Sequence, residues 1–388
     1  MATPWTRPPQ RRRAGAATVA AAAAAVAASF AGTAALPAQS AAVVPAVATD
    51  LPGNAAMAMP LRWSHGTLQV FVDANLLPTG LVGQSLTGVT LRRPTLPGDG
   101  AYAPIARTLT VRGGIATTLA ANQGAGLAAN RPANTLTLFG PALVTSLAAP
   151  APGPATVVGS DVLAIPFATP LPVTTGTLFL EFEVGNPPLQ ISGEHWVDAI
   201  WQTDGVDQGL VAGVGDGSCT VRSAPNRLRW TAATGPLPGT AAACQLVGGA
   251  PGGLACMWAG IDAQARNPGP GFLGFGFDLG LVDPGLVGCR QWAPLDLLWG
   301  GVADGAGTFA TALAIPGAAT VGLRLALQGA WVEPSRPGLP LSLANGLVLV
   351  VGSAGVTNRC SSVFFPGAAT TSPWPSFVGQ MPVLRLHW

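Results

Sequence analysis

The chain has little charge and no long apolar segment beyond its N-terminus. Only 9% of its 388 residues are charged, and every basic residue is Arg, whereas a typical soluble domain has about 25% charged residues. After residue 42, Gly, Pro or Arg breaks each apolar run well before the roughly 20 residues that a membrane-spanning helix needs. The composition therefore predicts that the chain is not a polytopic membrane protein.

Motifs of familiar enzyme classes are also missing. The chain has 3 His, and it has no HExxH zinc motif, no GxSxG nucleophile elbow and no Gly-rich phosphate-binding loop. Four of its 19 Arg lie before residue 14 and every acidic residue lies after them, so the rest of the chain has 15 Arg against 17 acidic residues. A nearly neutral chain has no basic surface for nucleic acid, and we expect no such partner.

The N-terminus has the three parts of a secretory signal peptide. Arg11, Arg12 and Arg13 precede an uncharged, Ala-rich stretch over residues 14–36, and small residues offer cleavage sites at 38–40 or 40–42. An uncleaved anchor helix is the alternative. We predict a signal peptide over residues 1–42, and hence export to the extracellular space, the cell surface or the periplasm. Residues 43–62 are expected to be a disordered lead-in.

Short β-like runs follow from residue 63 onward. The 51 Gly and 37 Pro stand between apolar runs, as turn residues between strands do. The clearest run, TLFLEFEV over residues 177–184, places Leu178, Leu180, Phe182 and Val184 on one face. Such period-two runs predict an all-β fold with two antiparallel β-sandwich modules in tandem, of jelly-roll or immunoglobulin-like type.

A Gly-rich stretch at residues 213–218 marks the predicted boundary between the modules. We place an N-terminal module at residues 63–217 and a Cys-containing C-terminal module at residues 218–352. Residues 353–388 form a tail whose structure the sequence does not indicate, and which would complete a sheet of either module.

All 5 Cys lie in the second half of the chain. In an exported protein such residues are candidates for disulfides. Cys244 and Cys256 flank a Gly-rich turn and are the first predicted pair. Cys219 and Cys289 are the second, which leaves Cys360 over.

Several short motifs, in this order, resemble those of secreted two-module β-proteins from large-genome, GC-rich bacteria. They are LRR (91–93), LAAN (127–130), IPF (165–167), GTLFLEFEV (176–184), VDA (197–199), VGC (287–289), IP (315–316) and LANGL (343–347). The family has no established activity. The resemblance therefore implies architecture and export, and it assigns no catalytic residue.

The densest polar cluster lies at residues 194–216. Asp198, Asp204 and Asp207 are candidate oxygen ligands for Ca²⁺. A solvated loop between strands is the alternative that we favour, and no other cofactor is expected. Glu181 and Glu183 lie on the same face of one strand, about 7 Å apart, within the range of a glycosidase carboxylate pair. A solvent-facing strand surface is the alternative here.

The chain has 11 Trp but only 1 Tyr. Exposed indole rings stack on the apolar faces of sugar rings, so Trp196 and Trp201, with Glu194 and Asp198 beside them, form a candidate ligand site. Trp as ordinary core bulk is the alternative. We expect a non-enzymatic interaction or structural role with an extracellular protein or glycan as partner. A carbohydrate-binding module, assisted by Ca²⁺, and an extracellular glycoside hydrolase are the two alternatives.

Overall fold

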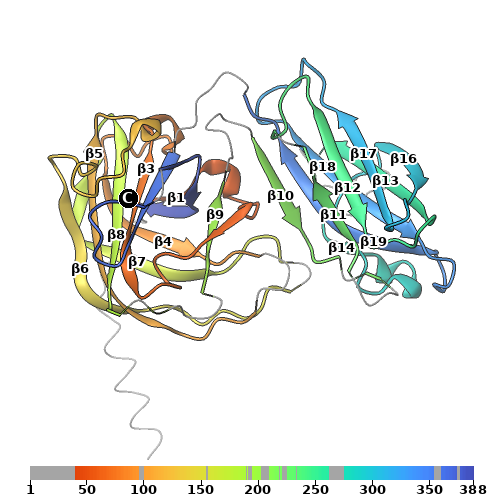
Figure 1. The fold of residues 1–388 in the computed structure, drawn as a ribbon, viewed down its shortest axis with the longest axis horizontal. Coiled ribbons are helices and arrows are strands. Elements are labelled where there is room, and N and C mark those ends of the chain that lie inside the picture. The colour runs from red at the N-terminus through yellow and green to blue at the C-terminus, as the bar shows by residue number, and fades with distance from the viewer. Residues whose placement is uncertain are drawn as a thin grey trace, which may run out of the picture. The chain divides into compact units, whose positions relative to one another are not determined.

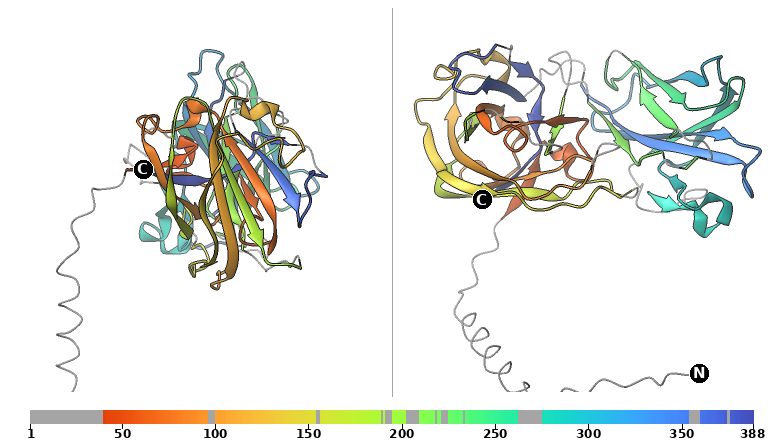
Figure 2. Two further views of the ribbon diagram at one scale, coloured as in Figure 1. Left: turned by 90° about the vertical axis from the view of Figure 1, so that its left-hand side faces the viewer. Right: turned by 60° about the horizontal axis from the view of Figure 1, so that its bottom comes forward.

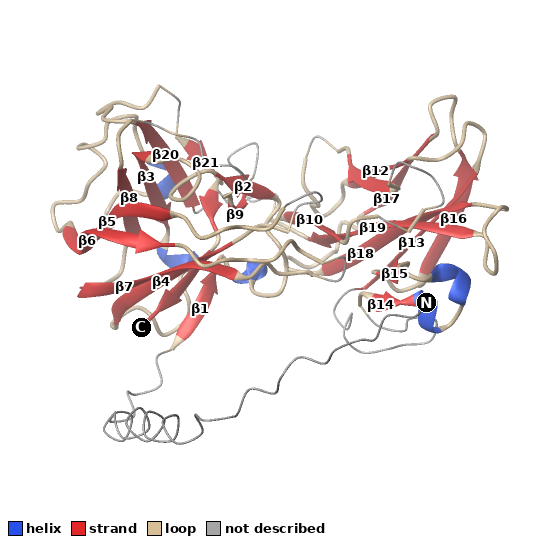
Figure 3. Cartoon of the chain, turned by 90° about the horizontal axis from the view of Figure 1, so that it is seen from below, coloured by secondary structure: helices blue, strands red, loops and turns tan. Residues whose placement is uncertain are grey.

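In the residues described below, the structure, a computed structural model of the chain, consists of strands and turns, with helix limited to short 3-10 turns (Figure 3). It describes residues 40–95, 100–153, 156–188, 190, 195–201, 209–217, 219–220, 225–232, 234–261, 275–353, 360–373 and 376–388. The predicted signal peptide up to residue 39 and the candidate ligands Glu194, Asp204 and Asp207 lie outside these residues. The predicted all-β class is confirmed.

Two antiparallel sheets enclose the largest core. The six-stranded sheet has the order β21 (Phe377–Val378), β20 (Cys360–Pro366), β3 (His65–Val72), β8 (Thr177–Gly185), β5 (Ala106–Ala116), β6 (Leu136–Thr145). The four-stranded sheet has the order β1 (Ala41–Val44), β23 (Leu384–His387), β4 (Ser85–Arg92), β7 (Asp161–Pro172). Short 3-10 turns follow β1, β3 and β5 at η2 (Ala46–Ala48), η3 (Ala74–Leu76) and η4 (Ala120–Asn122).

The clearest predicted strand is confirmed as β8. Its residues Leu178, Leu180, Phe182 and Val184 are all buried in one apolar cluster with residues of both sheets. The opposite face of β8 is covered as well, because Phe179 packs in a second cluster with Ala120 of η4. The alternation in the sequence thus identified the core face, while the covering of the other face depends on the loop between β5 and β6.

The predicted disordered lead-in is ordered, and this prediction is wrong. Ala41 and Ala42, assigned to the signal peptide, begin β1, which pairs with β23 near the C-terminus. Further along, β2 (Ala55–Met57) pairs with β9 (Val197–Ile200). Leu51 and Met59 are buried. The strands that order this segment come from more than a hundred residues away, so its own Pro- and Ala-rich sequence does not reveal the pairing.

The tail returns to the N-terminal half of the chain. Its strand β20 pairs with β3, β22 (Met381–Pro382) pairs with β9, and β23 pairs with β4. In Figures 1 and 2 its blue strands lie among the orange and yellow strands of that half. The predicted module at residues 63–217 is therefore incomplete without the lead-in and the tail. Residues 209–352 are inserted between its parts, so a tandem order does not describe the connectivity.

The inserted part has its own sheets and core. Its five-stranded sheet has the order β10 (Leu210–Val214), β19 (Leu341–Val350), β18 (Arg324–Val332), β13 (Leu254–Ile261), β16 (Leu297–Val302). A three-stranded sheet has the order β11 (Arg227–Trp230), β12 (Ala241–Val247), β17 (Thr308–Ala314). Residues of both sheets form one apolar cluster. A short hairpin joins β14 (Phe277–Asp278) and β15 (Arg290–Gln291), with η6 (Leu279–Leu281) and η7 (Pro284–Leu286) between them.

One of the two predicted disulfides is present. Cys219 and Cys289 form a disulfide, which confirms that pair. Cys244 and Cys256 are free thiols, so the prediction that they pair is wrong. Cys244 on β12 packs in the core between the two sheets, whereas Cys256 faces the opposite side of β13, beside Trp258. Successive side chains of a strand point to opposite faces. The neighbours of Cys256 on β13 therefore face Cys244, whereas Cys256 itself points away from it. Cys360 is buried on β20.

None of the described helices has the length and apolar character needed to cross a membrane.

Candidate functional site

The two candidate tryptophans lie at the two ends of one short strand. Trp196 precedes β9 and Trp201 follows it. Both line the same cavity, whose volume is about 270 Å³. Both residues therefore contribute to one surface, and that this surface binds a ligand stays a prediction.

Hydrogen bonds on either side of β9 hold the main chain at both tryptophans. The Tyr102 hydroxyl donates to the Trp196 carbonyl at 3.1 Å. The Asn54 side chain holds Trp201 from both sides, since its Oδ1 accepts from the Trp201 amide at 2.8 Å and its Nδ2 donates to the Trp201 carbonyl at 2.9 Å. Asn54 belongs to the lead-in, so the ordering of that segment positions Trp201. The Trp201 side chain remains 49% exposed.

The cavity is almost wholly apolar. Its lining residues are Ala56, Met57, Ala58, Met59, Trp63, Leu68, Trp196, Trp201, Ser362, Phe364, Phe377 and Gln380. Five of them are aromatic, and Trp63 meets Phe364 edge to face, with ring centroids 4.5 Å apart. Concave apolar cavities with a few polar groups are the usual form of small-molecule sites. We call this cavity the aromatic pocket.

Four separate segments of the chain build the aromatic pocket. The lead-in and the start of β3 supply one wall, β9 and its flanks supply the two predicted tryptophans, and two parts of the tail supply the rest. Sequence reasoning missed Trp63, Phe364 and Phe377. Their only signal is their aromatic character, because the tail could not be assigned to a sheet from its own pattern.

A positive charge lies against one wall of the aromatic pocket. The Arg62 guanidinium carbon is 3.9 Å from the centroid of the Trp196 ring, which is a cation–π contact. Arg62 lies between Met59 and Trp63, two further lining residues.

Asp198, predicted as a ligand residue, has a different position. Its side chain is 1% exposed, and it forms an ion pair with Arg92 at 2.7 Å. The Gly53 amide donates to both carboxylate oxygens, at 3.0 and 3.1 Å. Arg92 in turn donates to the carbonyls of Ala48 and Leu51. Arg92 and Asp198 thus fasten the lead-in to β4 and β9, and the carboxylate is turned away from solvent.

Asp198 belongs to no candidate metal site among the residues that the structure describes. In the described residues, no group of three or more His, Cys, Asp and Glu is arranged to hold a metal ion. Asp204, Asp207 and Glu194, on which the Ca²⁺ and ligand predictions also depend, lie outside those residues.

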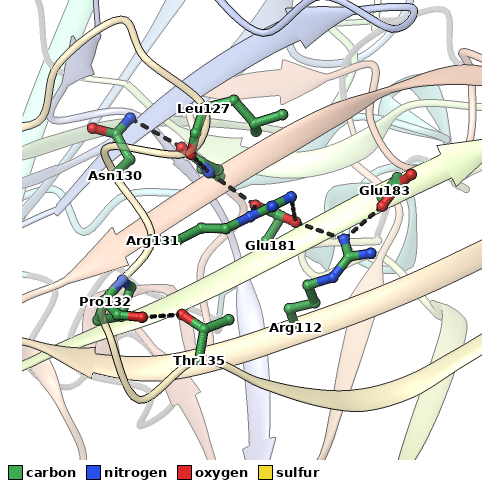
Figure 4. A network of polar contacts seen from close by, with 9 residues as sticks. Arg112, Leu127, Asn130, Arg131, Pro132, Thr135, Glu181 and Glu183 are labelled. Atoms are coloured by element: carbon green, nitrogen blue, oxygen red, sulfur yellow. Dashed lines mark hydrogen bonds and ion pairs between the residues drawn. The ribbon is translucent and has the colours of Figure 1, made fainter.

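The two carboxylates of β8 are joined by Arg residues (Figure 4). Arg112 Nη1 is 2.7 Å from Glu181 Oε1 and 2.5 Å from Glu183 Oε2. Arg131 and Gln69 also donate to Glu181, which is fully buried. Burial by itself would raise the pKa of Glu181, but hydrogen bonds from Arg131, Gln69 and Arg112 outweigh it and the pKa is lowered. A glycosidase acid needs a raised pKa, so this pair is poorly suited to that role.

This network instead holds the loop between β5 and β6 over the sheet. Gln69 Nε2 donates to the Leu127 carbonyl and Gln69 Oε1 accepts from Asn130 Nδ2. Arg131 reaches Glu181 from the same loop (Figure 4). The LAAN motif therefore closes the outer face of β3 and β8.

A comparison of the chain with protein-family models, with curated proteins and with solved structures found no match.

Proposed function

We propose that this is an exported, non-enzymatic binding protein that takes a small apolar or amphipathic ligand in the aromatic pocket. The observation that carries the proposal is the convergence of five aromatic side chains from four segments of the chain on one apolar cavity. The fold is proposed to comprise two β-sandwich modules, the first completed by the lead-in and the tail. Export agrees with the Cys219–Cys289 disulfide, because such bonds persist in oxidising compartments.

A non-enzymatic role is favoured by the state of the acidic groups. Asp198 and Glu181 are buried and ion-paired, and both tie surface segments to the sheets. Neither points into the aromatic pocket, whose polar lining groups are those of Ser362 and Gln380. Such a site can bind and orient a ligand, and the described residues that line it offer no group suited to proton transfer.

The aromatic pocket also supports a second candidate, a glycan as the ligand. Trp201 is about half exposed, and a partly exposed indole ring can stack on the apolar face of a sugar. A glycan array with the wild-type protein and with Trp201→Ala tests this candidate. Binding to a sugar that the variant no longer retains would support it.

The direct test is a titration with the neutral fluorescent probe N-phenyl-1-naphthylamine. We expect saturable binding to the exported, oxidised protein and an affinity about tenfold lower for Trp201→Ala, since contact with an aromatic side chain contributes roughly 1–2 kcal/mol. The matched control is Leu298→Ala, which removes an apolar side chain that is 67% exposed on β16. Equal losses in both variants would show that the probe binds exposed apolar surface and would refute the site.

A further inference from the structure

Arg62 differs from Arg92, Arg93, Arg290 and Arg324 in how its charge is satisfied. Arg92 pairs with Asp198 and donates to two carbonyls, and Arg93 donates to the carbonyls of Pro150 and Gly100. Arg290 and Arg324 each have a buried Nε without a partner, but their guanidinium groups pair with Asp278 and Asp50. These side chains need no further anion.

In the described part of the chain, Arg62 has no such anion. Its Nε is buried and has no hydrogen-bond partner, and no carboxylate in the described part of the chain forms an ion pair with it. Its contact is with the ring of Trp196, at 3.9 Å. A guanidinium has five N–H donors and keeps its charge at any ordinary pH. Buried donors without a partner are rare in native structures and often mark a missing group.

The surroundings of Arg62 indicate what that group is. Trp196, over which the guanidinium lies, is a wall of the aromatic pocket, and Trp63, the residue after Arg62, lines the same pocket. A ligand with its apolar body in the pocket would therefore have one end near a planar cation. Arg matches a carboxylate with two parallel hydrogen bonds, and such charge-assisted bonds are about twice as strong as neutral ones.

We infer that the ligand of the aromatic pocket is an amphipathic carboxylate, with an alkyl or aryl body among the aromatic side chains and its anionic head on Arg62. This inference rests on the proposed function and specifies the ligand class. Arg62 is the residue that determines specificity, since the pocket walls alone accept any apolar body of suitable size. Neutral sugars have no anion for Arg62 and would not satisfy it.

The experiment measures displacement of N-phenyl-1-naphthylamine from the full-length exported protein by octanoate, octanol and octylamine. These three share one alkyl chain and differ in the charge of the head group. Phenylbutyrate and phenylbutanol form a second pair, which distinguishes an aryl from an alkyl body. We expect octanoate to bind most tightly and octylamine most weakly. In Arg62→Gln, the ratio of octanoate to octanol affinity should fall about tenfold while octanol affinity is retained.

Arg229→Gln is the matched control, because Arg229 is exposed on β11. The ratio of octanoate to octanol affinity in this variant should equal that of the wild type. Far-UV circular dichroism establishes that both variants are folded. If octanol displaces the probe but the ratio of octanoate to octanol affinity is the same in Arg62→Gln and the wild type, this inference is overturned and the proposed function stands. If neither the probe nor octanol binds in a Trp201-dependent way, both are overturned.

Discussion

Breaking the buried pair of Arg92 and Asp198 should be one of the most destabilising single changes in the N-terminal half, because it leaves one charge buried without its partner. Both side chains are almost completely buried, and the pair joins β4, β9 and the lead-in. The change to make is Asp198→Ala. It leaves the charge of Arg92 in the interior without its counter-ion and leaves the Gly53 amide without its acceptor.

The expected loss of unfolding free energy depends on which hydrogen-bond acceptors remain around Arg92. Removing one partner of a buried ion pair costs about 3–5 kcal/mol, because the other charge stays buried and uncompensated. In Asp198→Ala, Arg92 keeps the carbonyls of Ala48 and Leu51 as acceptors, so we expect the lower end, about 3 kcal/mol. Because Gly53 loses its tie to β9, the lead-in wall of the aromatic pocket should loosen and N-phenyl-1-naphthylamine should bind more weakly.

Urea unfolding followed by far-UV circular dichroism measures this cost. The control is Arg385→Gln, since the pair of Arg385 and Asp161 is more than a third exposed on both sides, and exposed pairs contribute about 0–1 kcal/mol. The double variant Arg92→Met with Asp198→Ala should cost at least about 1.5 kcal/mol less than the sum of the single variants. The reasoning is refuted if Asp198→Ala costs no more than Arg385→Gln.

Two further predictions concern ionisation. The pKa of Glu181 is lowered in the folded protein, so its ionised form stabilises the fold above the unfolded pKa of about 4.3, and this contribution is lost as the pH falls through the lowered folded value. Urea unfolding between pH 7 and pH 3 should show a smaller acid-dependent loss of unfolding free energy in Glu181→Gln than in the wild type. Equal losses would contradict the assignment. Burial raises the pKa of the Cys244 thiol to about 12 and also raises that of Cys256. Thiol reagents at pH 8 should therefore react with Cys244 only after unfolding. A disulfide between these two residues, found by mass spectrometry of a non-reduced digest, would contradict the structure.

The elements that the sequence predicts correctly are those set by local patterns. Residues 177–184 have an apolar residue at every second position from Leu178 to Val184, and β8 buries this predicted face. Cys219 and Cys289 were proposed as a pair and are bonded. The pairing of Cys244 and Cys256 was inferred from the turn between them, but it depends on which face of its own strand each residue occupies, on β12 and on β13. A Gly-rich turn does not determine that.

Distant pairings explain what local patterns could not predict. The lead-in lacks the alternation of a strand, and it is ordered by β23 and β9. The tail has two Pro-flanked aromatic residues, and Phe377 lines the aromatic pocket because β21 pairs with β20. Trp196 and Trp201 were identified as aromatic residues with acidic residues beside them. The walls opposite them come from segments whose position only the assembled sheets determine.

The measurement that tests the aromatic pocket most directly is photolabelling with an octanol analogue that has a diazirine in its chain. The labelled peptides are identified by mass spectrometry after digestion. We predict labels on peptides that contain residues 56–63, 196–201 and 362–380, because side chains of all three stretches line the cavity, and we predict that Trp201→Ala lowers this labelling. Labels gathered instead on the exposed apolar residues of β16, such as Leu297 and Leu298, with no effect of Trp201→Ala, would contradict the account.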